Sequence, residues 1–162
     1  MKSKQKRTQL KEEAKKNRAP AVDNRRARFE YHILESMEAG IVLTGTEIKS
    51  VREGGVSINE AYARMRDGEL WLLGMHIPPY KQGSFSNVDP NRPRKLLLHK
   101  EQIERLGGRA AEKGLTIVPL RMYFTRGRAK VEIGLARGKK VWDKREATAK
   151  RDVQREIARH IR

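Results

Sequence analysis

The sequence contains no cysteine among its 162 residues. This absence excludes a disulfide framework, thiol chemistry and a cysteine-ligated zinc site. Long apolar runs are also missing, since those within residues 70–75 and 95–99 are far too short to cross a bilayer. No charged segment followed by an apolar one opens the chain. We therefore expect no secretory signal and a cytoplasmic location.

Constellations of catalytic residues are scarce as well. His32, His76, His99 and His160 lie in separate segments without the spacing of metal ligands. There is no nucleophile elbow, and the glycine spacing of a phosphate-binding loop is absent. We expect a binding protein without metal or cofactor, and not an enzyme. A metal-dependent nuclease that uses Glu38 and Glu47 is an alternative, weakened because Glu47 also fits the role of a helix-capping residue.

Positive charge is concentrated at the two ends of the chain. Residues 1–28 carry 11 Lys and Arg against 3 Asp and Glu, and residues 137–162 carry 10 against 4, within a formal net charge of +17. Basic ends bind polyanions because neutralised phosphates release their counterions. Nucleic acid is therefore the expected partner. A membrane partner is not expected, because the basic ends lack a broad apolar helix face.

The charge pattern divides the chain into three parts. Residues 1–23 have too few apolar residues to offset the entropy of ordering, so we expect a basic mobile arm. Residues 24–136 form the expected folded core, and residues 137–162 form a basic tail.

Two helices are predicted in the core. A capping box of Thr44 and Glu47, followed by Gly54 in the position of a C-terminal cap, predicts a short helix with an inward-facing apolar side. Helical spacing predicts a second helix within residues 96–114, which we expect the glycine pair at 107–108 to split.

The remaining core is predicted to consist of strands. Residues 29–43 contain two extended runs, which we expect to be joined by a turn at Glu38-Ala39-Gly40. Residues 58–77 form a hairpin around an Asp-Gly turn at 67–68. Apolar and polar residues alternate along both halves of 115–135, which predicts the clearest hairpin.

About six short antiparallel strands with two or three short helices predict a closed or nearly closed β-barrel. One face of the sheet would form the core, and the polar outer faces would be free to contact a ligand. Residues 78–95 form a long loop rich in Pro, Gly, Ser and Asn, which we expect to be functional or mobile.

The tail has a narrow apolar stripe of Val153, Ile157 and Ile161. Such a stripe is too narrow to hold a helix on a core, so we expect a tail that is disordered alone and becomes helical against a polyanion. A helix docked on the barrel is the alternative. Trp142 lies among cations, where its ring can stack on an exposed base. It could instead fold back and anchor the tail on the barrel edge.

Three blocks carry a specific resemblance. They read NRRARFEYHILESMEAGIVLTGTEIKSVREG at 24–54, RPRKLLLH at 92–99 and KVEIGLARGKKVWDKRE at 130–146. Together they strongly resemble the SsrA-binding protein family, also called small protein B, over roughly residues 24–162. The resemblance implies an OB-fold-like barrel that binds the tRNA-like domain of tmRNA and enters stalled bacterial ribosomes in trans-translation. It also implies a ribosome-rescue protein that is a monomer when bound to tmRNA, and no enzyme.

The resemblance also assigns residues on the core to tmRNA. The expected contacts are Asn24, Arg25, Arg26, Arg28, Phe29, Tyr31, Glu38, Lys49, Arg52, Arg94 and Lys95. Phe29 and Tyr31 could equally belong to the barrel core, and Glu47 and Leu97 are expected to be structural. Forked and short polar side chains suit phosphates and base edges.

In the tail, the resemblance implies contact with the 16S rRNA decoding centre and the empty mRNA channel of the ribosome. The expected residues are Lys139, Lys140, Trp142, Asp143, Lys144 and Arg145. The family carries a histidine or another aromatic residue where this chain has Trp142, and base stacking tolerates that change. A general ribosomal or single-stranded RNA-binding barrel is the alternative function.

Overall fold

The computed structural model describes residues 21–161, while the side chains of Ser84, Lys113, Val141 and Trp142 lie outside its description. Most of the predicted arm, residues 1–20, is likewise outside the described residues. The strands are β1 (Val22–Asp23), β2 (Tyr31–Ile41), β3 (Tyr62–Arg66), β4 (Glu69–Leu73), β5 (Arg94–Leu97), β6 (Thr116–Thr125) and β7 (Arg128–Gly138). The helices are α2 (Arg25–Glu30), α3 (Gly45–Glu53), α4 (Lys100–Lys113) and α5 (Val141–His160), with a 3₁₀ turn at Ser84–Ser86.

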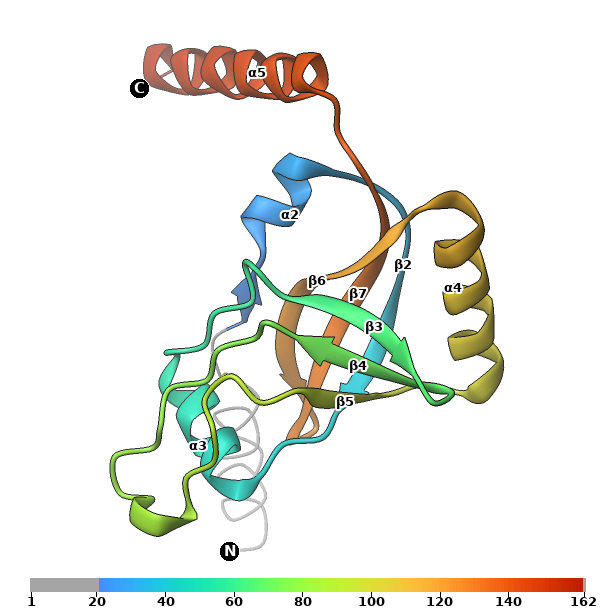
Figure 1. The fold of residues 1–162 in the computed structure, drawn as a ribbon. Coiled ribbons are helices and arrows are strands. Elements are labelled where there is room, and N and C mark those ends of the chain that lie inside the picture. Colours follow the sequence, from blue (N-terminus) through green and yellow to red (C-terminus); the bar gives the residue numbers. More distant parts are fainter. Residues whose placement is uncertain (1–20, 162) are drawn as a thin grey trace, which may run out of the picture.

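Six strands close into an antiparallel barrel. They follow the order β6–β3–β4–β5–β2–β7, and the pairing of β6 with β7 closes the ring. In Figure 1, β3, β4 and β5 form the near wall, and β2, β6 and β7 lie behind them. The predicted fold class, a mainly antiparallel β-barrel with short helices, is confirmed. The pairing of β1 with β6 brings two residues that were assigned to the arm into the sheet.

The core is formed by every second residue of the strands. On β7, Val131, Ile133 and Leu135 are buried, as the period of two predicts. Leu70 and Leu72 of β4 are buried from the opposite wall. The hairpin turn between β3 and β4 occurs at Asp67-Gly68, where both residues have positive φ, and this prediction is also confirmed. Outward-facing residues are available to solvent only where no helix covers the strand, because Val118, Leu120 and Ala136 are buried in a second cluster with Ala27 of α2.

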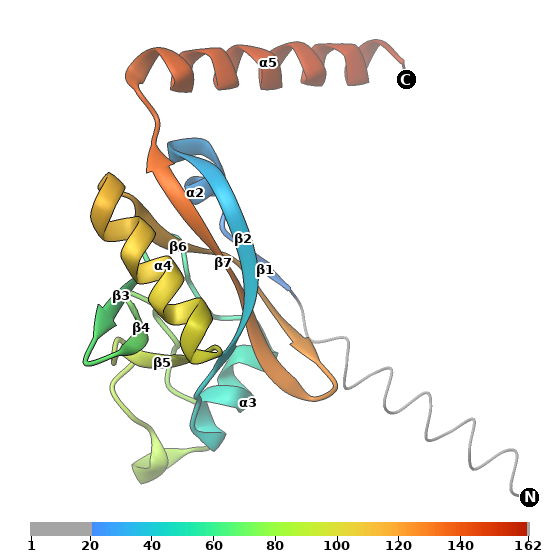
Figure 2. The ribbon, with the colours of Figure 1, turned by 90° about the vertical axis from the view of Figure 1, so that its right-hand side faces the viewer.

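Helices cover parts of the barrel. The capping box of Thr44 and Glu47 begins α3, and Gly54 ends it in a left-handed conformation, as predicted. Figure 2 shows α4 lying across one side of the barrel. Arg105 of this helix forms an ion pair of 2.6 Å with Glu35 of β2. None of the described helices has the length and hydropathy of a membrane span.

The turn predicted at Glu38-Ala39-Gly40 is wrong, because β2 runs through it as one strand of 11 residues. Gly40 pairs with Lys130 on one side and with Leu97 on the other. A Cβ at Gly40 would lie 3.1 Å from the Cβ of Leu97. The glycine therefore permits close packing against the neighbouring strand and does not mark a change of direction.

The split predicted in the second helix is also wrong, since α4 is continuous through Gly107 and Gly108. Here too a glycine serves close packing, because a Cβ at Gly107 would lie 2.9 Å from the Cγ of Met65. The helix ends at Gly114, which adopts a left-handed conformation.

The basic tail contains helix α5, which extends beyond α2 and away from the barrel (Figures 1 and 2). Its apolar stripe is exposed, with Val153 at 55% and Ile157 at 54%. The apolar stripe of α5 therefore does not pack against the barrel, as the alternative of a docked helix would require. That helix formation depends on a polyanion stays a prediction.

Candidate nucleic-acid interface

Two residues assigned to RNA are buried, which corrects their assignment. Asn24 is 1% exposed, and its amide donates to the carbonyls of Ile58 (3.1 Å) and Pro119 (2.8 Å). Its side-chain oxygen accepts from the amide of Ala27 (3.0 Å), which makes Asn24 the N-cap of α2. Every polar atom of this side chain is therefore used inside the protein.

Arg94 is the second buried residue, with 0% exposure. Its guanidinium contacts Glu47 Oε2 at 2.6 Å and donates to the carbonyls of Met75 (2.7 Å) and Pro90 (3.0 Å). Glu47 also accepts from Arg92 and from the amide of Thr44. Arg94 therefore holds α3 and the long loop together and has no donor facing solvent.

The same contacts bear on the nuclease alternative. Both carboxylate oxygens of Glu47 are occupied by protein donors. Within residues 21–161 no group of three His, Asp or Glu side chains could hold a metal ion. Glu47 is a structural residue, as its capping position suggested.

Helix α2 presents the first basic block. Arg25 and Arg28 are exposed, and neither forms an ion pair within the part of the chain that is described. Arg26 differs, because it contacts Glu30 at 3.1 Å and Glu60 at 3.2 Å. The hydrogen bond with Glu30 raises the pKa of Arg26. Arg25 and Arg28 are thus the cations of α2 that are free to bind phosphate.

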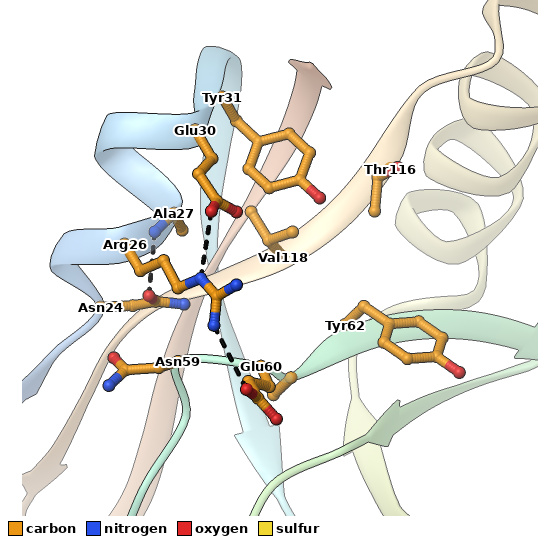
Figure 3. Close-up of a pocket in the computed structure, with 11 residues that line it drawn as sticks. Asn24, Arg26, Ala27, Glu30, Tyr31, Asn59, Glu60, Tyr62, Thr116 and Val118 are labelled. Atoms are coloured by element: carbon orange, nitrogen blue, oxygen red, sulfur yellow. Dashed lines mark hydrogen bonds and ion pairs between the residues drawn. The ribbon is translucent and has the colours of Figure 1, made fainter. Parts of the chain in front are cut away.

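A cavity of about 270 Å³ lies beside α2. Figure 3 shows Arg26 held between Glu30 and Glu60 in its wall, with the rings of Tyr31 and Tyr62 also lining it. Tyr31 is half-buried against a small apolar cluster. It is thus partly core and partly accessible, between the two roles predicted for it.

The start of the tail is attached to α2 and to the beginning of β2. His32 Nε2 lies 3.2 Å from Asp143 Oδ2, and the guanidinium of Arg151 lies 4.7 Å from the ring centre of Phe29. The backbone amide of Lys139 donates to the carbonyl of Glu30 (2.8 Å). Phe29 is therefore half-buried beside the tail and belongs to neither core cluster, while its contact with RNA stays a prediction.

These attachments bring the two basic blocks of the sequence together. The tail residues Lys140, Lys144 and Arg145 follow directly after the strand that ends beside α2. Lys144 is half-buried, and the other two are exposed. Asp143 is engaged by His32 and caps the helix, so the cations are the tail residues available to RNA. The predicted stacking role of Trp142 concerns a side chain outside the description.

Glu38 lies elsewhere, on β2, a strand that belongs to the far wall of the barrel in Figure 1. It is 49% exposed, accepts a short hydrogen bond from the hydroxyl of Tyr123, and lies 3.9 Å from Lys130 Nζ. Burial and the hydrogen bond to Glu38 raise the pKa of Tyr123 to about 12. Tyr123 therefore remains a donor at neutral pH and fixes one oxygen of the carboxylate.

Three cations accompany Glu38 that the sequence did not single out. Arg126, Arg128 and Lys130 line a groove of about 560 Å³ together with Glu38 and Thr125. We call these five residues the Glu38 groove. Arg126 and Arg128 flank the turn of the β6–β7 hairpin, where Arg126 has a positive φ of 52°. The sequence feature that could have indicated these cations is a basic turn between two strands in which apolar and polar residues alternate.

The remaining predicted residues lie on other parts of the surface. Lys49 of α3 lies over the ring of Tyr80 at 5.5 Å, and Arg52 lies over the ring of Phe124 at the same distance. Lys95 is on β5 and forms an ion pair of 2.8 Å with Glu69. The sequence-predicted set is thus divided between the α2–α5 junction, the Glu38 groove, α3 and the near wall.

Comparisons with known proteins point in one direction. A family model described as "SmpB protein" matches residues 21–162. The SsrA-binding protein of Carboxydothermus hydrogenoformans is 57% identical over 141 residues, covering 87% of this chain and 95% of that protein. The SsrA-binding protein of Desulforudis audaxviator is 58% identical over 139 residues, covering 86% and 91%.

A solved structure is similar as well. It is described as "tmRNA-SmpB: a journey to the center of the bacterial ribosome", and it matches with a TM-score of 0.66 and 56% sequence identity. The match covers 80% of this chain and 95% of that one. The likeness therefore includes both the fold and the sequence.

Proposed function

Since the chain belongs to the SmpB family of bacterial SsrA-binding proteins, we propose that it binds tmRNA and delivers it to the ribosome for rescue. The observation that carries this proposal is the 56% identity to the solved tmRNA–SmpB structure over 80% of the chain. The family is one of RNA-binding proteins, and the chain is not an enzyme. It acts in the cytoplasm, as a monomer when bound to tmRNA.

The barrel binds tmRNA through the Glu38 groove. Arg126, Arg128 and Lys130 supply positive charge for phosphates, while Glu38 can accept hydrogen bonds from bases or 2′-hydroxyls. Because Tyr123 fixes Glu38, its free lone pairs keep a constant direction. A fixed acceptor among cations favours a particular RNA shape over an arbitrary polyanion.

The tail reaches a different RNA. Helix α5 extends from the barrel with most of its surface exposed, and the basic residues 139–145 lie at its base. In this proposal Lys139, Lys140, Lys144 and Arg145 contact 16S rRNA, Trp142 stacks on a base of the decoding centre, and the rest of the helix follows the mRNA channel. Arg25 and Arg28 lie beside the same junction and add phosphate contacts.

A competition experiment tests the tmRNA assignment. Labelled tRNA-like domain of tmRNA is bound near physiological salt, and elongator tRNA or unstructured RNA is added in excess. Retention of the labelled RNA is expected. Equal competition by every RNA would mean that the net charge of +17 alone accounts for binding.

A truncation tests the tail separately. The deletion should begin at Val141, because Arg137 and Gly138 belong to β7 and pair with β2. We expect the truncated chain to keep its preference for tmRNA over tRNA and to lose tagging on stalled ribosomes. If the truncation removed the preference for tmRNA, the separation of roles between barrel and tail would be wrong.

A further inference from the structure

The near wall of the barrel carries a row of side chains that the proposed function does not use. Arg64 of β3 is directly opposite Trp71 of β4, and Trp71 is directly opposite Lys95 of β5. Opposite residues on adjacent strands lie side by side on one face of a sheet. An indole is therefore flanked by two cations across three strands.

This row faces outward. The neighbours of Trp71 along β4, Leu70 and Leu72, are buried in the core at 0% exposure, and side chains alternate between the faces of a strand. Trp71 is half-buried, while Arg64 is exposed. In Figure 1 none of the described helices crosses the outer face of β3, β4 and β5. The indole is thus on a surface that is open within residues 21–161.

A groove of about 300 Å³ lies over the row. Its walls are Arg64, Met65, Arg66, Trp71, Leu73 and Pro93. Its floor is thus apolar and aromatic, and its rim carries two exposed arginines that form no ion pair among the described residues. This combination fits a nucleotide, whose flat base can stack on the indole while its phosphate contacts the arginines.

The acidic residues nearby leave the rim positive. Glu69, next to the row, is engaged by Lys95 at 2.8 Å. The hydrogen bond from Lys95 lowers the pKa of Glu69, so this carboxylate stays charged and paired with Lys95. Asp67, in the β3–β4 turn, is the other carboxylate close to Arg66 in the chain. Arg64, Arg66 and Lys95 outnumber these two carboxylates.

We propose that this surface, which we call the Trp71 face, binds a segment of unpaired RNA, with one base stacked on Trp71 and adjacent phosphates held by Arg64 and Arg66. Stacking on an aromatic ring within a basic groove is the general means of binding single-stranded nucleic acid. A double helix cannot bind in this way, because its bases are already stacked on one another. The occupant is therefore single-stranded RNA.

The Trp71 face is separate from the Glu38 groove. In the closed ring of strands, β4 is three strands away from β7, which carries Lys130. The two sites thus lie on opposite walls, and one protein can contact two RNA segments at once. The Trp71 face does not depend on the identity of the RNA in the Glu38 groove.

Tryptophan fluorescence tests the proposal directly. The chain has two tryptophans, so Trp142→Phe in the full-length protein leaves Trp71 as the sole tryptophan, which can be excited selectively over the four tyrosines. We expect oligouridine near physiological salt to quench it saturably, and a duplex RNA of equal length to quench it much less. The double variant Arg64→Ala, Arg66→Ala should raise the oligouridine concentration that gives half-maximal quenching. It should also lower the slope of log K against log salt by about 1.4, since each phosphate contact on a single strand contributes about 0.7.

Arg137→Ala is the matched control for Arg64→Ala alone, since each variant loses one exposed strand arginine. Arg137 is an exposed strand arginine on β7, without an ion pair among the described residues, and its loss removes one charge from the opposite wall. It should leave the quenching midpoint unchanged. In the truncated chain that ends at Lys140, Trp71→Ala should weaken the binding of labelled oligouridine about 5- to 150-fold. Fluorescence anisotropy of the labelled RNA measures this affinity. Circular dichroism confirms that each variant is folded.

Three results would overturn the proposal. They are the absence of saturable quenching, equal quenching in the arginine variants and the Arg137 control, and equal competition by polyglutamate, which would indicate an acidic protein partner. The tmRNA assignment is judged by a different measurement, the preference for tmRNA over tRNA. Loss of that preference with quenching intact would reject only the tmRNA assignment, and the reverse result would reject only the Trp71 face.

Discussion

Replacing Glu47 with Gln tests whether the buried ion pair with Arg94 is structural. The substitution keeps the shape of the side chain and an oxygen that can accept from the amide of Thr44. It removes the charge that faces Arg94, which is 0% exposed and has no solvent contact to compensate. The free energy of unfolding should therefore fall.

The expected loss is about 3–5 kcal/mol, the usual cost of leaving one partner of a buried pair uncompensated. For a chain of this length that corresponds to a decrease in Tm of roughly 6–20 °C. Glu47→Gln should also change the pH dependence. Burial alone would raise the pKa of Glu47, but hydrogen bonds from Arg92, Thr44 and Arg94 lower it below its ordinary value of 4.5.

A lowered pKa in the folded state means that the charged carboxylate stabilises the protein above pH 4.5, and that this stabilisation is lost as the pH falls through the lowered pKa. The variant should lack that part of the acid sensitivity. Urea unfolding at pH 7 and at several lower values measures both effects. Glu53→Gln, at an exposed residue of the same helix, is the control and should change stability by less than about 0.5 kcal/mol. A Glu47→Gln protein within about 1 kcal/mol of the wild type, with unchanged pH dependence, would refute the reasoning.

Two further predictions concern RNA. Lys130→Ala should weaken tmRNA binding and reduce the slope of log K against log salt by about 1, because one phosphate contact is lost. Lys100 is 87% exposed on α4, so Lys100→Ala should change neither the affinity nor the slope. Titrations over a range of salt concentrations measure both quantities. If both lysines behaved alike, binding would not be localised to the Glu38 groove. Trp142→Ala should reduce tagging of stalled ribosomes about 5- to 150-fold while Trp142→Phe retains most of it, and equal loss in both variants would exclude stacking.

The hairpins of the barrel could be predicted because their signals are local. Alternation of apolar residues and the turn at 67–68 depend on residues close together in the chain. The glycines were misread for the opposite reason. Gly40 and Gly107 are required by Leu97 and Met65, which approach them from distant elements. A single sequence does not distinguish a glycine that bends the chain from one that admits a neighbour.

The same limit applies to the site. The basic ends were visible as composition, whereas the individual tail residues were assigned from the family resemblance. Arg94 and Asn24 were assigned to RNA because they lie in the blocks that resemble the family, yet their partners lie far away in the chain, at Glu47 and Pro119. Only the folded structure shows that a cation is already neutralised. Trp71 was overlooked because a tryptophan in an apolar strand is indistinguishable from core until the register is known.

The strength of each attachment bears on the proposal that the barrel holds tmRNA while the tail reaches a second RNA. The Glu38 groove is built on β2, β6 and β7, whose ladders are continuous and closed into the barrel. Among the described side chains, α5 contacts that barrel and α2 through His32–Asp143 and through Arg151 over Phe29. Single contacts of these kinds contribute on the order of 1 kcal/mol each. In the proposed function, breaking these contacts to reorient α5 would cost less than deforming the closed sheet that carries the Glu38 groove, so the tail would reach the ribosome while the groove keeps its geometry.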